Sequence, residues 1–174
     1  RTKWKEIVDL SEKLSKQFIE DTTPKESKVL IPYVSAYGYT LKMAETIKKG
    51  ILEVGDIEVE LLDIEHLPLG ELDNKLTHAN AFIVGSPTIS QNTLLPIYRL
   101  FAVINPLRDK GKLAGAFGYY GWSGEGVRIV EENLRGFKLN VFRQAIATKF
   151  KAHDDSYTDL LNYGRAFGKA LLQK

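Results

Sequence analysis

A chain of 174 residues, of which 44% are hydrophobic and 26% charged, has the composition of one globular domain with a core of its own. Its 24 basic and 22 acidic residues leave a formal charge of +2 without a long basic block, so we expect neither DNA nor RNA as a partner. The absence of cysteine excludes a cysteine-held iron–sulfur cluster, a thiol redox centre and a disulfide scaffold. No apolar run approaches the ~20 residues that span a bilayer, so we expect no membrane segment and take the cytoplasm as the default compartment.

The first part of the chain predicts an amphipathic helix that is separate from the remainder. Five apolar residues fall close to one helical face, with lysines and glutamates between them: Trp4, Ile7, Val8, Leu14 and Phe18. The polar stretch 20–28 carries Pro24 and is predicted to be a linker. We therefore expect a division into a helix with its linker (1–27) and a domain (28–174). The helix either packs on that domain or ends a preceding one, and Arg1 in place of methionine favours an excised C-terminal domain.

From residue 28 onward, β-rich runs alternate with helical periodicity. Strands are predicted at 29–34, 57–62, 81–84, 113–117 and 142–148. Helices are predicted at 41–54, 93–104, 124–134 and 156–172, and Pro96 is tolerated in the first turn of the second helix. This alternation predicts an α/β fold, a doubly wound parallel sheet of five strands with helices on both faces. Ligands bind such sheets beyond the carboxyl ends of the strands, which singles out the loops after the first, third and fourth strands.

The loop after the first predicted strand reads SAYGYT, residues 35–40. It precedes a helix, where free amides and the helix dipole favour a phosphate. It lacks the lysine and second glycine of a nucleotide-triphosphate loop, and Gly38 stands alone rather than within G-x-G-x-x-G. The remaining amides and hydroxyls suit a terminal phosphate monoester that is held and never transferred. The alternative is a polar turn of the kind found in any α/β protein.

The loop after the third predicted strand reads GSPTISQNTLLP, residues 85–96. Ser86, Thr88, Ser90 and Asn92 offer polar groups, and Pro87 stiffens the backbone. The alternative is that Asn92 or Thr93 only caps the following helix.

The loop after the fourth predicted strand reads FGYYGWSGEG, residues 117–126. Its glycines let the backbone come close to a flat ligand, and the indole of Trp122 offers a stacking face. The alternative is that Trp122 is a core or surface aromatic residue. Taken together, the three loops supply a phosphate site, small polar groups and a stacking ring, and these are the needs of flavin mononucleotide (FMN).

The stretches SAYGYT, GSPT and YYGWSGEG, in this order and spacing, resemble the flavodoxin-like domain of flavodiiron proteins, also called A-type flavoproteins. The resemblance covers about residues 28–174, and YGWSGE is its most specific part. It implies a flavodoxin-like fold with strand order 2-1-3-4-5. It also implies three groups of FMN-binding residues: Ser35, Ala36, Tyr37, Gly38, Tyr39 and Thr40 at the phosphate; Pro87, Thr88, Ile89, Ser90 and Asn92 beside the ring; and Tyr120, Gly121, Trp122, Ser123 and Gly124 closing the site.

In that family the domain follows a metallo-β-lactamase-like domain whose diiron centre reduces dioxygen or nitric oxide. The resemblance implies that electrons pass from a reductase or rubredoxin-like donor, through FMN, to a diiron domain outside this chain, commonly across a head-to-tail dimer. No H-x-E-x-D ligand run occurs here, and His66, His78 and His153 are far apart in the sequence, so we expect no metal site in this chain. We also expect electron transfer without acid–base catalytic residues.

Two other functions stay open at the level of the sequence. A free-standing NAD(P)H-dependent flavin or quinone reductase would share the fold, although no nicotinamide fingerprint is recognisable. A flavodoxin-fold interaction module without FMN would share it as well. A phospho-acceptor receiver is discounted, because the first predicted strand ends in hydroxyl residues rather than an acidic group. The sequence therefore does not decide whether the chain is itself an enzyme.

Overall fold

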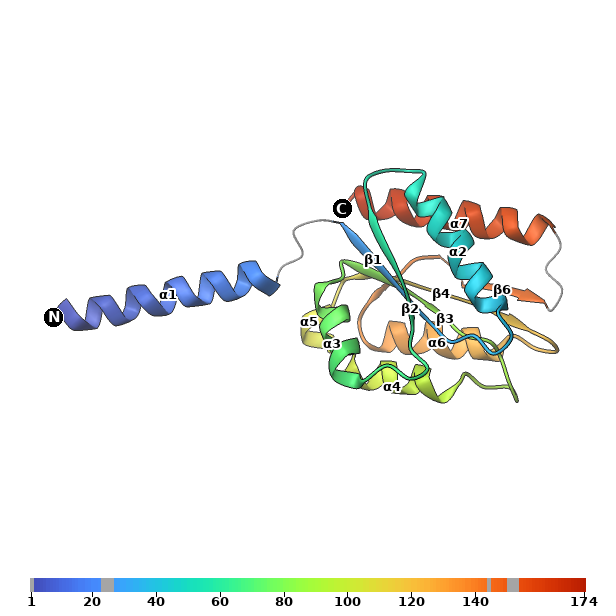
Figure 1. The fold of residues 1–174 in the computed structure, drawn as a ribbon, viewed down its shortest axis with the longest axis horizontal. Helices are drawn as coiled ribbons and strands as arrows, with labels where there is room; N and C mark the ends of the chain where they lie inside the picture. Colours follow the sequence, from blue (N-terminus) through green and yellow to red (C-terminus); the bar gives the residue numbers. More distant parts are fainter. Residues whose placement is uncertain (1, 23–26, 144, 150–153) are drawn as a thin grey trace.

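A parallel β-sheet forms the centre of the protein in a computed structural model that describes residues 2–22, 27–143, 145–149 and 154–174 (Figure 1). The strand order is β2-β1-β3-β4-β5, and β6 also pairs with β4. This order confirms the predicted doubly wound sheet and the flavodoxin-like topology. The strands have these bounds: β1 (Lys28–Tyr33), β2 (Glu58–Asp63), β3 (Ala81–Gly85), β4 (Leu113–Tyr120), β5 (Asn140–Val141) and β6 (Ile146–Lys149).

Helices cover both faces of the sheet (Figure 1). Residues that alternate along β1 point to opposite faces, so Val29 and Ile31 join one core cluster and Leu30 joins the other. The first cluster includes α2 (Tyr39–Leu52) and α7 (Asp154–Leu172). The second includes the larger helices of the other face: α3 (Leu69–His78), α4 (Leu95–Val103) and α6 (Glu125–Gly136). Because both faces are buried, the central strands are almost entirely apolar, as the sequence predicted.

Helices α2 and α7 touch backbone to backbone through two glycines. A Cβ atom on Gly50 would overlap the carbonyl oxygen of Leu161, and a Cβ atom on Gly164 would overlap the carbonyl oxygen of Ile47. The two helices therefore lie closer together than any pair with side chains at these positions could. Since α2 begins directly after the loop 35–38, this contact also sets where that loop lies on the sheet.

The N-terminal helix is confirmed as α1 (Thr2–Thr22), and it lies apart from the sheet and its covering helices (Figure 1). Trp4, Ile7 and Leu14 are exposed along it. The predicted linker 20–28 is wrong at both ends, because α1 runs to Thr22 and β1 begins at Lys28. Its centre lies outside the described residues. None of the described helices is long and apolar enough to cross a membrane.

The predicted fifth strand, 142–148, is wrong in outline, because two short strands stand in its place. Strand β5 ends at Val141 and β6 begins at Ile146. Between them, Arg143 has a left-handed backbone (φ 51°) that no extended strand contains. The amide of Ala145 donates to the carboxylate of Glu131 on α6 (2.9 Å) instead of to a neighbouring strand. Tertiary contacts therefore break a segment whose composition favours a continuous strand.

Helix α3 and the short helix α5 (Pro106–Asp109) were not predicted. The spacing of Leu69, Leu72 and Leu76 carries the signal for α3, since two of these leucines are buried on one face. Strand β4 is longer than predicted and reaches Tyr120, so Tyr119 and Tyr120 belong to the strand rather than to the loop after it.

Asp109, at the end of α5, is fully buried and accepts from Arg108 (2.7 Å) and Lys112 (2.8 Å). Burial raises its pKa, but these hydrogen bonds and one from the amide of Asn105 outweigh that effect and hold the pKa below the ordinary 3.8. The contribution of the Asp109 charge to the free energy of unfolding is therefore complete above pH 3.8 and is lost as the pH falls through the folded-state pKa of Asp109. We expect Asp109→Asn to lower the free energy of unfolding by about 1–2 kcal/mol at neutral pH.

Urea unfolding from neutral pH into the acid range measures this effect. The wild type and Asp109→Asn should converge in stability as the pH falls below 3.8. A constant difference across the whole range would mean that the Asp109 charge contributes nothing.

Candidate functional site

The loop after β1, residues 34–38, is built around a left-handed glycine. Gly38 has φ 83° and immediately precedes α2, and a side chain there would strain this backbone. Its amide donates to the hydroxyl of Ser35 (3.0 Å), which closes the loop on itself. Ala36, Tyr37 and Gly38 are exposed, and the Tyr37 side chain is 74% accessible. The start of α2 thus faces solvent through a short, uncharged loop.

Thr40, in the first turn of α2, is the one predicted phosphate partner that is fully buried. Its hydroxyl has no hydrogen-bond partner among the described residues. A buried hydroxyl without a partner costs about 1–3 kcal/mol, so its presence at a helix N-terminus calls for an explanation. A phosphate bound at this helix start would supply the missing acceptor.

The loop after β3 ends in a tight turn under backbone strain. The amide of Ile89 donates to the carbonyl of Asn92 and the amide of Asn92 donates to the carbonyl of Ile89, both at 3.0 Å. The two residues between them, Ser90 and Gln91, have φ values of 52° and 59°. Two adjacent left-handed residues are the mark of a type I′ turn, which glycine or asparagine normally occupies. The strained tip is exposed, so Ile89 and Ser90 are presented to solvent.

Hydrogen bonds within this loop exclude the helix-capping alternative. The hydroxyl of Thr93 donates to Ser86 (2.7 Å) and accepts from no amide of α4, which begins at Leu95 without a side-chain cap. The side-chain oxygen of Asn92 accepts from the amide of Thr93 (2.9 Å) and from the hydroxyl of Tyr98 (2.6 Å). The polar groups of the loop therefore hold its own shape.

Trp122, in the loop after β4, is 95% exposed, which excludes the core alternative for this residue. Gly121 before it is exposed as well, and Ser123 and Gly124 are half-buried. An indole so little covered by protein is free to stack on a flat ligand. Glu125, which sequence reasoning missed, begins α6 beside it. Hydrogen bonds from Ser123 and from its own amide hold the pKa of Glu125 below the usual range.

Ring and backbone contacts join the three loops into one surface. Tyr39 packs edge-on against Tyr119 of β4, with ring centroids 5.4 Å apart, which joins the first loop to the end of the strand that leads into the third loop. Thr88 pairs with Tyr120, and its hydroxyl accepts from the amide of Gly126 (3.1 Å), which joins the second loop to the third. A Cβ atom on Gly126 would lie 2.7 Å from that hydroxyl, so only glycine permits this approach.

The surface offers groups that suit the two ends of FMN, its phosphate and its flat ring. The first loop offers a helix start and the buried hydroxyl of Thr40 to a phosphate. Pro87 is buried beneath the second loop, and the exposed Ile89 and Trp122 offer apolar surface to a ring. The three loops, 35–40, 85–92 and 120–124, carry no charged side chain, so a phosphate here would be held by amides and hydroxyls.

The described residues contain no group of three or more histidine, cysteine, aspartate or glutamate side chains that could hold a metal ion. His66 is exposed beside Glu65, and His78, at the end of α3, donates from Nδ1 to the carbonyl of Asn74 (2.8 Å). His153 lies outside the described residues.

Comparison with known proteins agrees with this geometry. A type A flavoprotein from Rhodobacter capsulatus is 37% identical over 149 residues, which cover 86% of this chain and 33% of that protein. A flavo-diiron protein from Clostridium acetobutylicum is 36% identical over 140 residues, which cover 80% of this chain and 35% of that protein. The rubredoxin oxygen:oxidoreductase of Desulfovibrio gigas superposes with a TM-score of 0.84 at 27% identity, over 95% of this chain and 41% of that one. The chain spans about a third of the length of these curated relatives.

A doubly wound sheet with uncharged loops at its carboxyl edge has the place where α/β proteins of this architecture bind nucleotide cofactors. The Flavodoxin family matches residues 31–164, so this chain belongs to the flavodoxin family, and its relatives place it with the flavodoxin-like domain of the flavodiiron, or A-type, flavoproteins. The family therefore confirms the predicted cofactor, because flavodoxins and flavodiiron proteins bind FMN.

Thr40→Val tests the phosphate part of the site. Valine keeps the shape of threonine, and no protein hydrogen bond is lost, so the FMN-free chain should unfold at the same urea concentration or a slightly higher one. The affinity for FMN should fall about tenfold, because a hydrogen bond to a charged group is worth about 1.5–3 kcal/mol, while riboflavin should be unaffected. Fluorescence titration with both ligands measures the difference. Equal losses for FMN and riboflavin would contradict a role at the phosphate.

Proposed function

We propose that this chain is an electron-transfer domain that passes electrons, through FMN, from a reductase or rubredoxin-like donor to a diiron centre outside this chain that reduces oxygen or nitric oxide. One observation carries the proposal: a buried, unpartnered hydroxyl at a helix start lies in the same loop cluster as an almost fully exposed indole. The names of two relatives, a flavo-diiron protein and a rubredoxin oxygen:oxidoreductase, support the donor and acceptor.

The residues proposed to hold FMN fall into three groups, one for each loop. The phosphate group is Ser35, Ala36, Tyr37, Gly38, Tyr39 and Thr40. The ring group of the second loop is Pro87, Thr88, Ile89, Ser90 and Asn92. The remaining group is Tyr120, Gly121, Trp122, Ser123 and Gly124. Ser35, Thr88 and Asn92 already accept hydrogen bonds inside the protein, so their part is to hold the loops in place.

Bound FMN supplies the redox chemistry, and the protein's part is to orient it and set the energies of its redox states. Trp122 would cover one face of the ring and exclude water there. Glu125, whose pKa is lowered, brings a negative charge to the start of α6. This charge would oppose the build-up of further negative charge in the neighbouring site. No side chain of the cluster is needed to carry a proton.

We further propose that the chain divides into 1–27 and 28–174, with α1 belonging to a preceding domain. The exposure of Trp4 and Ile7 on α1 supports this division. The diiron domain would then be part of the same parent protein and would receive electrons within it or across a pair of protomers. The cytoplasmic location stays a prediction.

The visible absorption spectrum of the purified chain tests the proposal, with identification of any ligand released on denaturation. Flavin bands and released FMN are the expected result. No bands after incubation with excess FMN would favour a flavin-free interaction module. Steady-state oxidation of NAD(P)H by the loaded chain alone would favour a free-standing flavin or quinone reductase. Reduction by a protein donor without such turnover is the result expected of an electron-transfer domain.

A further inference from the structure

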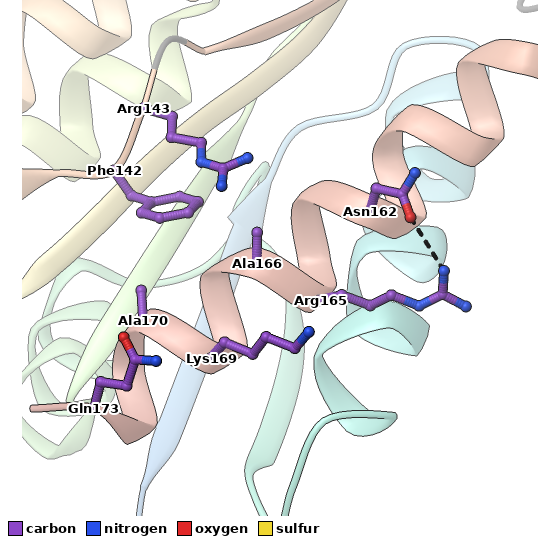
Figure 2. A pocket seen from close by; sticks show the side chains of 8 residues that line it. All are labelled: Phe142, Arg143, Asn162, Arg165, Ala166, Lys169, Ala170 and Gln173. Atoms are coloured by element: carbon purple, nitrogen blue, oxygen red, sulfur yellow. Dashed lines mark hydrogen bonds between the residues drawn. The ribbon is translucent and has the colours of Figure 1, made fainter.

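A groove runs along α7, outside the FMN loops, with a cavity volume of about 450 Å³ (Figure 2). One wall is the face of α7 that carries Asn162, Arg165, Lys169 and Gln173. The other wall is Phe142 and Arg143, in the segment between β5 and β6. None of these residues belongs to the three loops of the flavin site. The volume lies within the range of about 300–1,000 Å³ that is typical of small-molecule sites.

Positive charge gathers in this groove from both walls. Arg143, Arg165 and Lys169 line it, and no acidic side chain does. Arg165 and Lys169 stand four residues apart on one helix, a like-charge spacing that destabilises a helix by a few tenths of a kcal/mol. In the part of the chain that the structure describes, neither Arg143 nor Lys169 forms an ion pair. An anion between the walls would remove this repulsion.

Two of the cations are held in place before any ligand binds. The Nε atom of Arg165 donates to Glu53 (2.6 Å), and one terminal nitrogen donates to Asn162 (3.1 Å), as Figure 2 shows for the latter. The Arg143 guanidinium lies over the Phe142 ring, 5.1 Å from its centroid. The backbone of Arg143 is left-handed (φ 51°), a conformation that costs a non-glycine residue about 1 kcal/mol or more. Non-glycine residues in this conformation cluster at ligand sites, and this one lines the groove.

We propose that this groove binds a diphosphate group, either free or as part of a nucleoside diphosphate. Arginine forks match phosphate oxygens in pairs, and Lys169 adds a third positive charge from the helix. Glu53 neutralises part of Arg165, so the groove offers a net charge near +2, which suits an anion of two or more charges better than a monovalent one. The concave shape favours a small molecule over a protein surface, since a stable protein interface buries about 800 Å² on each partner.

Residue-resolved NMR of the full chain, titrated with pyrophosphate at low ionic strength, tests this proposal. The expected result is saturable amide shifts at Arg143 and along 162–173. Because the shifts locate the ligand, the outcome does not depend on whether the chain binds FMN. Shifts confined to residues 35–40 would overturn the groove proposal, as would the absence of saturation at millimolar pyrophosphate. A second titration with adenosine diphosphate distinguishes the source of the diphosphate group. If adenosine diphosphate binds more tightly than pyrophosphate does, the groove is assigned to a nucleotide. If it binds more weakly, the groove is assigned to free diphosphate.

A matched pair of variants separates a specific site from general attraction. Lys169→Glu reverses a charge inside the groove and should lower the affinity for pyrophosphate about tenfold or more. Lys5→Glu reverses an exposed charge on the separate helix α1 and should leave the affinity unchanged. Both side chains are exposed, so both variants should fold as the wild type does. Equal weakening by the two variants would mean that only net charge attracts the anion, and the proposal would fail.

Discussion

Gly164→Ala is expected to lower the free energy of unfolding by about 3 kcal/mol, the upper end of the range for overpacking. The added methyl group would overlap the carbonyl of Ile47, which is main chain and has no rotamer to move into. Helices α2 and α7 must then separate, and the core residues between them, Ile51 and Phe167 among others, lose contacts. Alanine returns about 1 kcal/mol of helix propensity, which is too little to offset this loss.

Gly136→Ala is the matched control for that substitution. Gly136 is also a helical glycine, at the end of α6, but a Cβ atom there would meet nothing within 4 Å. We expect it to leave stability unchanged or to raise it by up to about 1 kcal/mol. Thermal and urea unfolding of both variants measure the contrast. A Gly164→Ala variant as stable as Gly136→Ala would show that α2 and α7 do not pack through this glycine.

Trp122→Ala is expected to weaken FMN binding about 10- to 100-fold, since stacking on an aromatic side chain is worth about 1–3 kcal/mol per flat ring. The free protein should lose no stability, because the indole is 95% exposed and has little protein surface to lose. The reduction potential of the bound flavin should also shift, because stacking on the indole would stabilise the redox states of the flavin unequally. Fluorescence titration and a spectroelectrochemical titration measure the two effects.

The second tryptophan of the chain supplies the control. Trp4 is 73% exposed on α1, away from the sheet, so Trp4→Ala should leave both FMN affinity and reduction potential unchanged. Trp122→Phe keeps an aromatic face and should fall between the wild type and Trp122→Ala. If affinity and potential were unchanged in Trp122→Ala, Trp122 would lie outside the flavin site.

Much of the fold was predictable because a parallel sheet leaves a strong pattern in the sequence. Strand β3, and β1 after its first residue, are buried on both faces and are therefore apolar, and α2 shows the matching helical spacing. The fifth strand was not predictable in this way. Its interruption depends on the Glu131 carboxylate, which comes from another helix, and on a left-handed Arg143 that no local pattern indicates.

The parts of the candidate site that the sequence predicts most clearly are those made by the backbone itself. The Gly38 turn and the glycines around Trp122 have a recognisable local pattern, and the structure brings both loops to one edge of the sheet. The roles of individual hydroxyls were beyond the sequence. Ser35 and Thr88 carry the same kind of group as Thr40, yet they are engaged within the protein while Thr40 is not.

The sequence by itself determined the class of fold, its family and the three loops at the edge of the sheet, because apolar periodicity and glycine positions act over a few neighbouring residues. The tertiary structure alone decided which side chains are free for a ligand. Burial of Thr40, exposure of Trp122 and the grouping of Arg143 with Lys169 depend on segments far apart in the chain. Such contacts arise only when distant segments pack together, and no single segment contains them.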